Sequence, residues 1–405
     1  MQKFLLAVAA NLLFTGMTGW AQTRKVTDAE VMKVHKSAIL IDTHNDVTSR
    51  TVSGFDIGEH STEGHTDLPR LRAGGVGGVF FAVFVGGNYV KDNHAANRAM
   101  QMIDTTRHDI AGRYPKDFML AFTAADVEAA HNQGKIAALM GIEGGHAIED
   151  SLRLLRDFYL LGVRYMTLTH VNTNNWADSS GDIDVADVKH HNGLTDFGKD
   201  VVREMNRVGM IVDISHVSDK TFWDALEVSK APIFASHSSA KALSNIPRNM
   251  TDDMIIALAK KGGVVQINFG CDFLSQKSAD AAKSFDAFAK YRALSEKYKD
   301  SPDKLAAEMK TLFDEMKNKV PRATLADAVA HIDHVKTIAG IDAVGIGSDY
   351  DGVGCVPEGL DDNSKYPDLT RALLEKGYSA EDIRKIYGGN TLRLMRAVEK
   401  AAQSN

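Results

Sequence analysis

The sequence predicts an α/β protein, a (β/α)8 barrel of the TIM type with a helical insertion between its seventh and eighth strands. Three observations predict this fold: short apolar runs bounded by Gly, Asp or Asn, helical spacing of apolar residues between the runs, and polar residues at one end of each run. A doubly wound open sheet would show the same alternation of strand and helix. The number of runs, which is eight, favours the barrel.

The predicted strands are almost continuously apolar and rich in β-branched residues, as is typical of parallel strands covered on both faces. They span residues 38–42, 76–85, 136–142, 163–168, 210–214, 232–235, 263–268 and 343–347. Between them, residues 193–208 and 220–229 have the spacing of amphipathic helices, and Gly162, Gly209 and Gly262 stand just before the next strand. Each strand is therefore expected to be followed by a helix.

Residues 274–322 depart from the plain barrel pattern. This segment is long and charged, and it contains helical patterns at residues 285–298 and 304–317, between the seventh and eighth predicted strands. Its charge runs are most simply explained as a solvated helix face. The alternative is a cap or a subunit contact beside the strand ends.

The composition describes a soluble globular protein with a well-supplied core. The 405 residues are 44% hydrophobic and 25% charged, which excludes a disordered chain, a collagen and a membrane bundle. Lys and Arg number 47 against 53 Asp and Glu, and this mildly acidic balance argues against a nucleic-acid partner. We expect residues 22–405 to form a single barrel domain.

The first 21 residues have the pattern of a secretory signal peptide. Lys3 is followed by a mostly apolar run over residues 4–14, and small residues at Gly19 and Ala21 suit a cleavage site after Ala21. An uncleaved anchor is the alternative, but the run is shorter than the roughly 20 residues of a membrane span. Because the carboxyl-terminal tail is polar, we expect no membrane anchor after cleavage, and an exported, periplasmic protein.

Five metal-binding side chains follow predicted strands. His44 and Asp46 follow the first strand and point to the same side of an extended segment; Glu143 ends the third strand, His216 follows the fifth and His237 the sixth. In a barrel the carboxyl ends of the strands meet at one rim, so these side chains should converge. Nitrogen and oxygen donors without a thiolate suit borderline divalent metal ions.

Five ligands are too many for one open catalytic site, which usually has three protein ligands and a water. Two metal ions bridged by the Glu143 carboxylate would account for the number, and a shared water would then supply hydroxide at neutral pH. Each ligand alone is weak evidence, because an isolated His is more often a core or surface group. The prediction rests on their joint placement at strand ends.

Three further residues are expected at the same rim. His170 follows the fourth strand and could stabilise an oxyanion, Arg248 could hold a substrate carboxylate, and Asp349, after the eighth strand, could carry a proton. Each also has a structural explanation: a core histidine for His170, a surface ion pair for Arg248, and a helix cap for Asp349.

The motifs around these residues resemble those of the membrane (renal) dipeptidase family of binuclear zinc peptidases, in particular its secreted bacterial members. The resemblance covers nearly the whole chain after residue 21. It rests on segments in the family's order, at residues 41–46, 141–146, 168–170, 175–179, 213–216, 247–250, 347–352 and 389–393. The wider amidohydrolase group opens with a His-x-His pair, whereas His44-Asn45-Asp46 is similar to the dipeptidase variant.

The resemblance implies a zinc-dependent dipeptidase with two Zn²⁺ ions per chain. It places His44, Asp46 and Glu143 on one zinc, and Glu143, His216 and His237 on the other. It further implies that His170 contacts the substrate and stabilises the tetrahedral intermediate, that Arg248 binds the terminal carboxylate of the dipeptide, and that Asp349 handles protons. A homodimer is implied as well.

Several points stay open at this level. Asp351 lies on the same side of an extended segment as Asp349 and could take its role. Cys271 and Cys355 follow neighbouring strands, so either a disulfide or free thiols would fit. The stereochemistry at the carboxyl end of the substrate, including a D-residue, is also undetermined.

Two other functions would be compatible with parts of this pattern. The same barrel could carry another binuclear metal hydrolase acting on a lactone, a non-peptide amide or a phosphoester, because fold alone does not set the substrate. An exported binding protein without turnover would be expected to lack a ligand or the proton carrier, and the sequence contains all of them.

Overall fold

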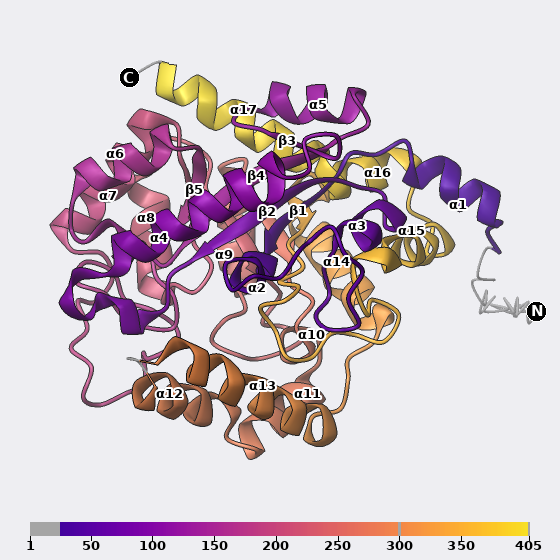
Figure 1. The fold of residues 1–405 in the computed structure, drawn as a ribbon. Helices are drawn as coiled ribbons and strands as arrows, with labels where there is room; N and C mark the ends of the chain where they lie inside the picture. The colour runs from indigo at the N-terminus through magenta and orange to yellow at the C-terminus, as the bar shows by residue number, and fades with distance from the viewer. Residues whose placement is uncertain (1–24, 299–300, 404–405) are drawn as a thin grey trace, which may run out of the picture.

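The computed structural model describes residues 25–298 and 301–403, and the predicted signal peptide at residues 1–21 lies outside them. Parallel strands form a nearly closed barrel in the order β1-β2-β4-β5-β6-β7-β8-β9 (Figure 1). The barrel closes where Asp46 N–H donates to the Tyr350 carbonyl (2.9 Å) and Asp349 N–H to the His44 carbonyl (3.0 Å). The predicted (β/α)8 fold is confirmed.

All eight predicted strands are present. Their bounds are β1 Leu40–Asn45, β2 Val76–Phe84, β4 Ile136–Glu143, β5 Val163–Thr167, β6 Ile211–Asp213, β7 Phe234–Ser238, β8 Val264–Ile267 and β9 Val344–Ile346. The prediction ended β1 and β7 three residues early, because polar side chains such as His44 and His237 continue these strands into the rim. A further strand, β3 (Phe118–Leu120), pairs with β4 outside the barrel order; its three residues are too short for a periodic signal.

Helices surround the barrel. Those outside the insertion are α1 Asp28–His35, α2 Val47–Thr51, α3 Leu68–Ala73, α4 Ala95–Asp104, α5 Ala124–Asn132, α6 Leu152–Leu160, α7 Asp196–Val208, α8 Asp219–Val228, α9 Asp252–Lys260, α14 Leu325–Ala339, α15 Tyr366–Glu375, α16 Ala380–Arg384 and α17 Asn390–Gln403. Side chains of Thr195 and Ser218 accept hydrogen bonds from the first turns of α7 and α8, which explains why these helices begin there. Gly209, with φ of 89°, ends α7 in the left-handed conformation that glycine adopts readily.

Tyr165 of β5 links the packed core to the barrel rim. Its ring packs against Phe80 of β2 and Phe234 of β7, with ring centroids 5.3 Å apart in both pairs. These side chains belong to a buried cluster that also includes residues of α5 and α17. The hydroxyl end of Tyr165 is therefore held at a fixed height beneath the rim.

The insertion between β8 and β9 consists of α10 Cys271–Leu274, α11 Gln276–Ser284, α12 Ala287–Lys297 and α13 Pro302–Lys319, which lie together on one side of the barrel (Figure 1). A disulfide between Cys271 and Cys355 joins its start to the loop after β9. Phe313 of α13 packs on Gly354 of the same loop, where an added Cβ would lie 2.6 Å from its ring.

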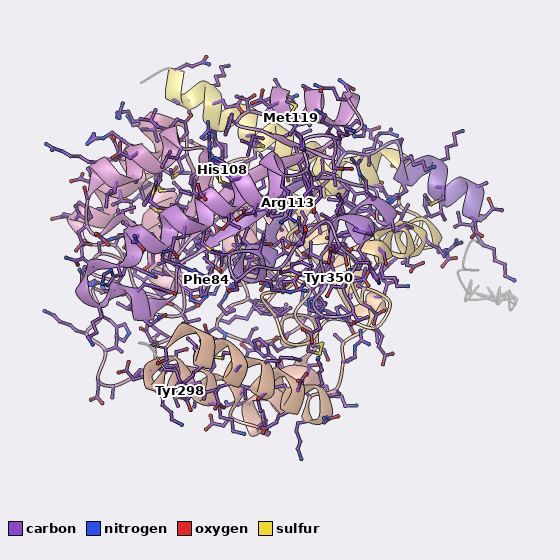
Figure 2. The ribbon with its side chains drawn as sticks, in the orientation of Figure 1. Phe84, His108, Arg113, Met119, Tyr298 and Tyr350 are labelled. Atoms are coloured by element: carbon purple, nitrogen blue, oxygen red, sulfur yellow. A yellow bond between two sulfur atoms is a disulfide. The ribbon has the colours of Figure 1, made fainter. Side chains whose placement is uncertain are left out.

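The insertion covers the end of the barrel at which the strands finish. In Figure 2, Phe84 at the end of β2 and Tyr350 after β9 lie between the strands and the insertion, which carries Tyr298. This is the rim at which the predicted site residues should meet. Among the described residues, no helix combines the length and the apolar character needed to cross a bilayer.

His331 of α14 holds the insertion against the barrel. Its Nδ1 accepts from the Ala240 N–H (3.1 Å), and its Nε2 donates to the Leu274 carbonyl of α10 (3.1 Å). Burial lowers the pKa of His331 to about 4. The ring is thus neutral in the folded protein and would be charged in the unfolded chain at mildly acidic pH.

We expect His331 to make the protein labile to acid. Below its unfolded pKa of roughly 6.5 the unfolded chain binds the extra proton, so stability falls by up to about 1.4 kcal/mol per pH unit until the folded pKa is reached. Urea unfolding across this range should show a flatter pH dependence for His331→Gln than for the wild type. His131→Gln, at an exposed position on α5, is the control. An unchanged slope in His331→Gln would contradict the expectation.

Candidate metal centre

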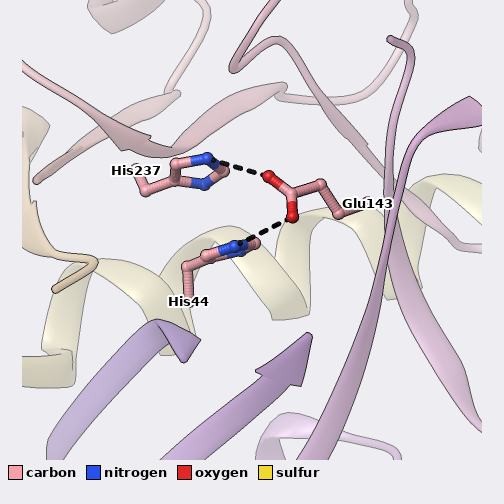
Figure 3. Close-up of side chains that lie close together, drawn as sticks. All are labelled: His44, Glu143 and His237. Atoms are coloured by element: carbon pink, nitrogen blue, oxygen red, sulfur yellow. Dashed lines mark ion pairs between the residues drawn. The ribbon is translucent and has the colours of Figure 1, made fainter. Parts of the chain in front are cut away.

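The structure brings the five predicted metal ligands together at the rim. Glu143, the last residue of β4, lies beside the stacked rings of His44 and His237, with one carboxylate oxygen toward each ring (Figure 3). Its Oε2 is 3.5 Å from His44 Nε2, and its Oε1 is 3.2 Å from His237 Nε2 and 2.9 Å from His216 Nε2. The same His44 Nε2 lies 3.2 Å from Asp46 Oδ2. Glu143 is therefore central in space as well as in strand order.

This cluster divides into overlapping groups whose ligand atoms lie within 4.8 Å of one another. Within the described chain, the groups are His44 with Glu143 and His237, Glu143 with His170 and His216, and His44 with Asp46 and Asp349. Glu143 and His44 each belong to two of them. The donors thus extend over more than one position that could hold an ion.

The cluster is buried, and part of its polar surface is unsatisfied. All five predicted ligands are at most 8% exposed. His44 Nε2 and Asp46 Oδ2 have no hydrogen bond of acceptable geometry to any described residue. Because an unsatisfied buried polar atom costs free energy, a ligand that both atoms could bind would relieve this cost. Imidazole and carboxylate donors without thiolate fit borderline divalent metal ions.

The electrostatics of the cluster favour a cation. Burial alone would raise the pKa of Glu143, but the neighbouring rings of His44, His170, His216 and His237 hold it well below its usual value. Burial alone would lower the pKa of His44, but Tyr165, Glu143 and Asp46 raise it well above its usual value. Burial lowers the pKa of His216 and His237, so both rings are neutral, the form that binds metals. A divalent ion would supply the positive charge that these carboxylates require.

Unusual backbone conformations place the site residues. His216, Asp349 and Asp351 have φ values of 67°, 61° and 66°, in the left-handed region that non-glycine residues rarely adopt and that is enriched at functional sites. Gly144, which follows Glu143, has φ of 104°, and an added Cβ there would lie 2.6 Å from the His146 ring. The glycines after Glu143 therefore let the chain turn sharply behind the carboxylate.

Tyr165 supports His44 from below. Its hydroxyl lies 2.7 Å from His44 Nδ1, which leaves Nε2 facing Glu143. A Cβ on Gly141 would lie 2.0 Å from the Tyr165 ring, so glycine at 141 makes room for this side chain. The sequence did not identify Tyr165 as a site residue, because its hydroxyl is a single polar group in an otherwise apolar strand.

His170 lies beside the cluster. Its Nε2 is 3.9 Å from Glu143 Oε1, and its ring lies 4.4 Å from that of His216. Burial lowers the pKa of His170 to about 4, so the ring is neutral. The geometry suits a hydrogen bond to a bound substrate as well as metal ligation.

The charged guanidinium group of Arg248 faces the site. Its guanidinium donates to the His237 carbonyl (3.2 Å) and the Ser238 hydroxyl (3.4 Å), and stands 5.2 Å from the Phe273 ring centroid. Burial lowers the pKa of Arg248 to about 10, which leaves it cationic at neutral pH. The described contacts do not include the surface ion pair that was the alternative explanation.

The structure separates Asp349 from Asp351. Asp349 Oδ2 accepts from Asn268 Nδ2 (2.7 Å), and this carboxyl is the one grouped with His44 and Asp46. Asp351 Oδ1 instead accepts from the His65 N–H (2.9 Å) and Arg50 Nη1 (3.3 Å). The expectation that both point the same way assumed an extended segment; it is wrong because both residues have left-handed backbones.

A model of the membrane dipeptidase family, peptidase family M19, matches residues 28–405. The chain belongs to this family. It is accordingly a metallo-dipeptidase, a hydrolase that acts on dipeptides and depends on metal ions, as the resemblance in its motifs implies.

Solved structures similar to the dipeptidase include the probable dipeptidase PvdM from Pseudomonas aeruginosa, at 25% identity and a TM-score of 0.78, with 93% of this chain and 99% of that chain covered. A metallo peptidase from Rhodobacter sphaeroides, liganded with a phosphinate mimic of the dipeptide L-Ala-D-Ala, is 25% identical, with a TM-score of 0.69 over 89% of this chain and 99% of that chain. A family M19 metallo peptidase, dipeptidase AC, is 26% identical, with a TM-score of 0.70 over 89% and 98%.

Proposed function

We propose that the dipeptidase holds two zinc ions, one by His44, Asp46 and Glu143 and the other by Glu143, His216 and His237. The observation that carries this proposal is the position of Glu143, whose two carboxylate oxygens face different histidines. Two bound zinc ions would polarise the scissile carbonyl and lower the pKa of a shared water so that hydroxide is present at neutral pH.

The chain's own residues would orient the dipeptide and move its protons. The Arg248 guanidinium is placed to bind the terminal carboxylate, which selects short substrates by charge. The neutral His170 ring donates a hydrogen bond to the carbonyl oxygen as negative charge develops there. The Asp349 carboxyl, whose pKa burial raises well above its usual value, takes a proton from the attacking water and returns it to the departing amine.

We further propose that the carboxyl-terminal residue of the substrate can have the D configuration. The Rhodobacter sphaeroides relative is liganded with a mimic of L-Ala-D-Ala, which supports this at 25% identity. The test is a panel of L,L and L,D dipeptides with added zinc, beside a lactone and a phosphotriester. Release of amino acids from L,D dipeptides is expected; turnover of only the lactone or phosphotriester would overturn the proposed function.

The proposed location is the periplasm, after removal of residues 1–21. The disulfide between Cys271 and Cys355 supports export, because disulfides are typical of oxidising compartments. Cell fractionation with amino-terminal sequencing would test the location and the cleavage site. The homodimer remains a prediction, to be tested by the molar mass of the protein in solution.

Arg248→Ala should weaken substrate binding without removing metal. Loss of a charge-assisted pair costs about 1.5–3 kcal/mol, so KM for dipeptides should rise roughly 10- to 100-fold while the bound metal is unchanged. Steady-state kinetics and metal analysis measure the two quantities. Arg72→Ala, an exposed arginine paired with Asp117, is the control. An unchanged KM would remove the proposed role of Arg248.

A further inference from the structure

Two buried aspartates on the barrel repeat one hydrogen-bond pattern. Asp213, at the end of β6, accepts from Ser236 N–H (2.8 Å) and Ser236 Oγ–H (2.6 Å) on β7, and from the N–H of Ser215 (3.1 Å). Asp42 of β1 accepts from Ser348 N–H (2.8 Å) and Ser348 Oγ–H (2.6 Å) after β9. It also accepts from the His44 N–H (3.4 Å). Each carboxylate thus binds both donors of one serine on the next strand and an N–H two residues ahead. We call these arrangements the Asp213–Ser236 and Asp42–Ser348 latches.

The latches lie where the barrel has the fewest strand-to-strand pairs. The β6–β7 ladder contains a single residue pair, Asp213 with Phe234. Across β1 and β9 the described chain has only the isolated bridge between Asn45 and Tyr350. Every other neighbouring pair of barrel strands shares at least three residue pairs. Backbone N–H groups left without a ladder partner need another acceptor, and the aspartates provide it.

We call these two strand junctions, β6–β7 and β9–β1, the seams of the barrel. The same two seams carry the proposed metal ligands. His216 and His237 flank the Asp213–Ser236 latch, whereas His44 and Asp46 flank the Asp42–Ser348 latch, beside the proposed proton carrier Asp349. Movement of the Asp213–Ser236 seam would therefore displace His216 and His237 most directly, and movement of the Asp42–Ser348 seam would displace His44 and Asp46.

The Asp213–Ser236 latch also sets the orientation of a ring. Ser236 Oγ lies 2.7 Å from His237 Nδ1. The single hydroxyl hydrogen is donated to Asp213, which in its ionised form can only accept. Ser236 Oγ must then accept from Nδ1–H, and the lone pair of His237 is left on Nε2, which faces Glu143. Such outer partners fix the tautomer and direction of metal-ligating histidines.

We propose that Asp213 and Asp42 are positioning residues, each of which aligns the ligands of one of the two metal positions. Asp213 aligns His216 and His237, the ligands of one metal position. Asp42 aligns His44 and Asp46 at the other. This inference rests on the proposed two-metal function.

The test measures the affinity of each metal position in the full-length, zinc-loaded protein. Asp213→Asn and Asp42→Asn preserve shape but put an amide donor where the serines already donate. In competition titrations with a zinc chelator, each variant should bind one of its two ions roughly 10- to 100-fold more weakly and the other as the wild type does. Asp126→Asn, which alters the capping box of α5 away from the rim, is the matched control and should bind both ions normally.

Double variants identify which position each aspartate serves. Asp213→Asn combined with His237→Ala should bind no less zinc than His237→Ala alone, whereas Asp213→Asn combined with His44→Ala should lose one ion and bind the other roughly 10- to 100-fold more weakly. If Asp213→Asn fails to fold, Ser236→Ala removes only the hydroxyl and should weaken the same ion. Equal weakening of both ions, or of neither, would overturn the inference. A wild-type protein that binds fewer than two ions would instead overturn the proposed two-metal function, and the inference with it.

Discussion

The Glu143→Ala variant is expected to lose both metal ions together with its dipeptidase activity. The carboxylate lies within 3.5 Å of three imidazole nitrogens, those of His44, His216 and His237, and among the described residues it is the one carboxylate that belongs to two of the donor groups. Its removal also takes away a buried negative charge that would offset the charge of the bound cations. Because metal polarisation is worth several kcal/mol, activity should fall by on the order of 10³-fold or more.

Metal analysis after gel filtration, together with a dipeptide assay, measures both effects. Circular dichroism should show that the variant is folded. Glu128→Ala, an exposed glutamate paired with Arg396, serves as the control and should keep its metal. Two zinc equivalents retained by Glu143→Ala would exclude Glu143 as the bridge.

Asp349→Asn is expected to show the second-largest effect, on kcat alone. Asparagine keeps the shape of the side chain but cannot carry a proton, and general acid–base catalysis contributes about 10²- to 10⁴-fold. KM and metal content should change little, because Arg248 and the five proposed ligands are untouched. Measuring kcat, KM and bound zinc on one preparation separates proton transfer from ligation.

Asp351→Asn is the matched control, two residues further along the same loop. Since its carboxylate binds Arg50 and the His65 N–H, its loss should lower stability more than kcat. A fall in kcat confined to Asp351→Asn would assign the proton to Asp351, and a loss of zinc in Asp349→Asn would make that residue a ligand.

The strand ends were the most predictable part of the site. Apolar runs bounded by Gly, Asp or Asn depend on local periodicity, and parallel strands in a barrel all finish at one rim. The sequence therefore predicted that four side chains would meet, those of His44, Glu143, His216 and His237. The structure places them within a few ångströms of one another. No such pattern marks the partners beneath them, Tyr165 and Asp213, because contacts between strands have no fixed spacing in sequence.

The pairing of the two cysteines also could not be predicted from the sequence. Cys271 and Cys355 follow neighbouring strands, which allowed a bridge but did not require one. The structure joins them, and Cys271 N–H donates to the Cys355 carbonyl (3.0 Å) beside the disulfide. This pairing depends on how the insertion packs on the last βα loop, through contacts such as that of Phe313 with Gly354.

The amino-acid order alone determined the barrel, the kinds of donor atom at its rim and the family of the enzyme, since these follow from periodicity and short contiguous motifs. Three-dimensional packing decided that Asp349 rather than Asp351 faces the cluster, because left-handed φ values at both positions break the alternation of an extended chain. It likewise decided that Asp42 and Asp213 bind serines across the seams with the fewest strand-to-strand pairs, because each serine is distant in sequence and meets the carboxylate only in the folded barrel.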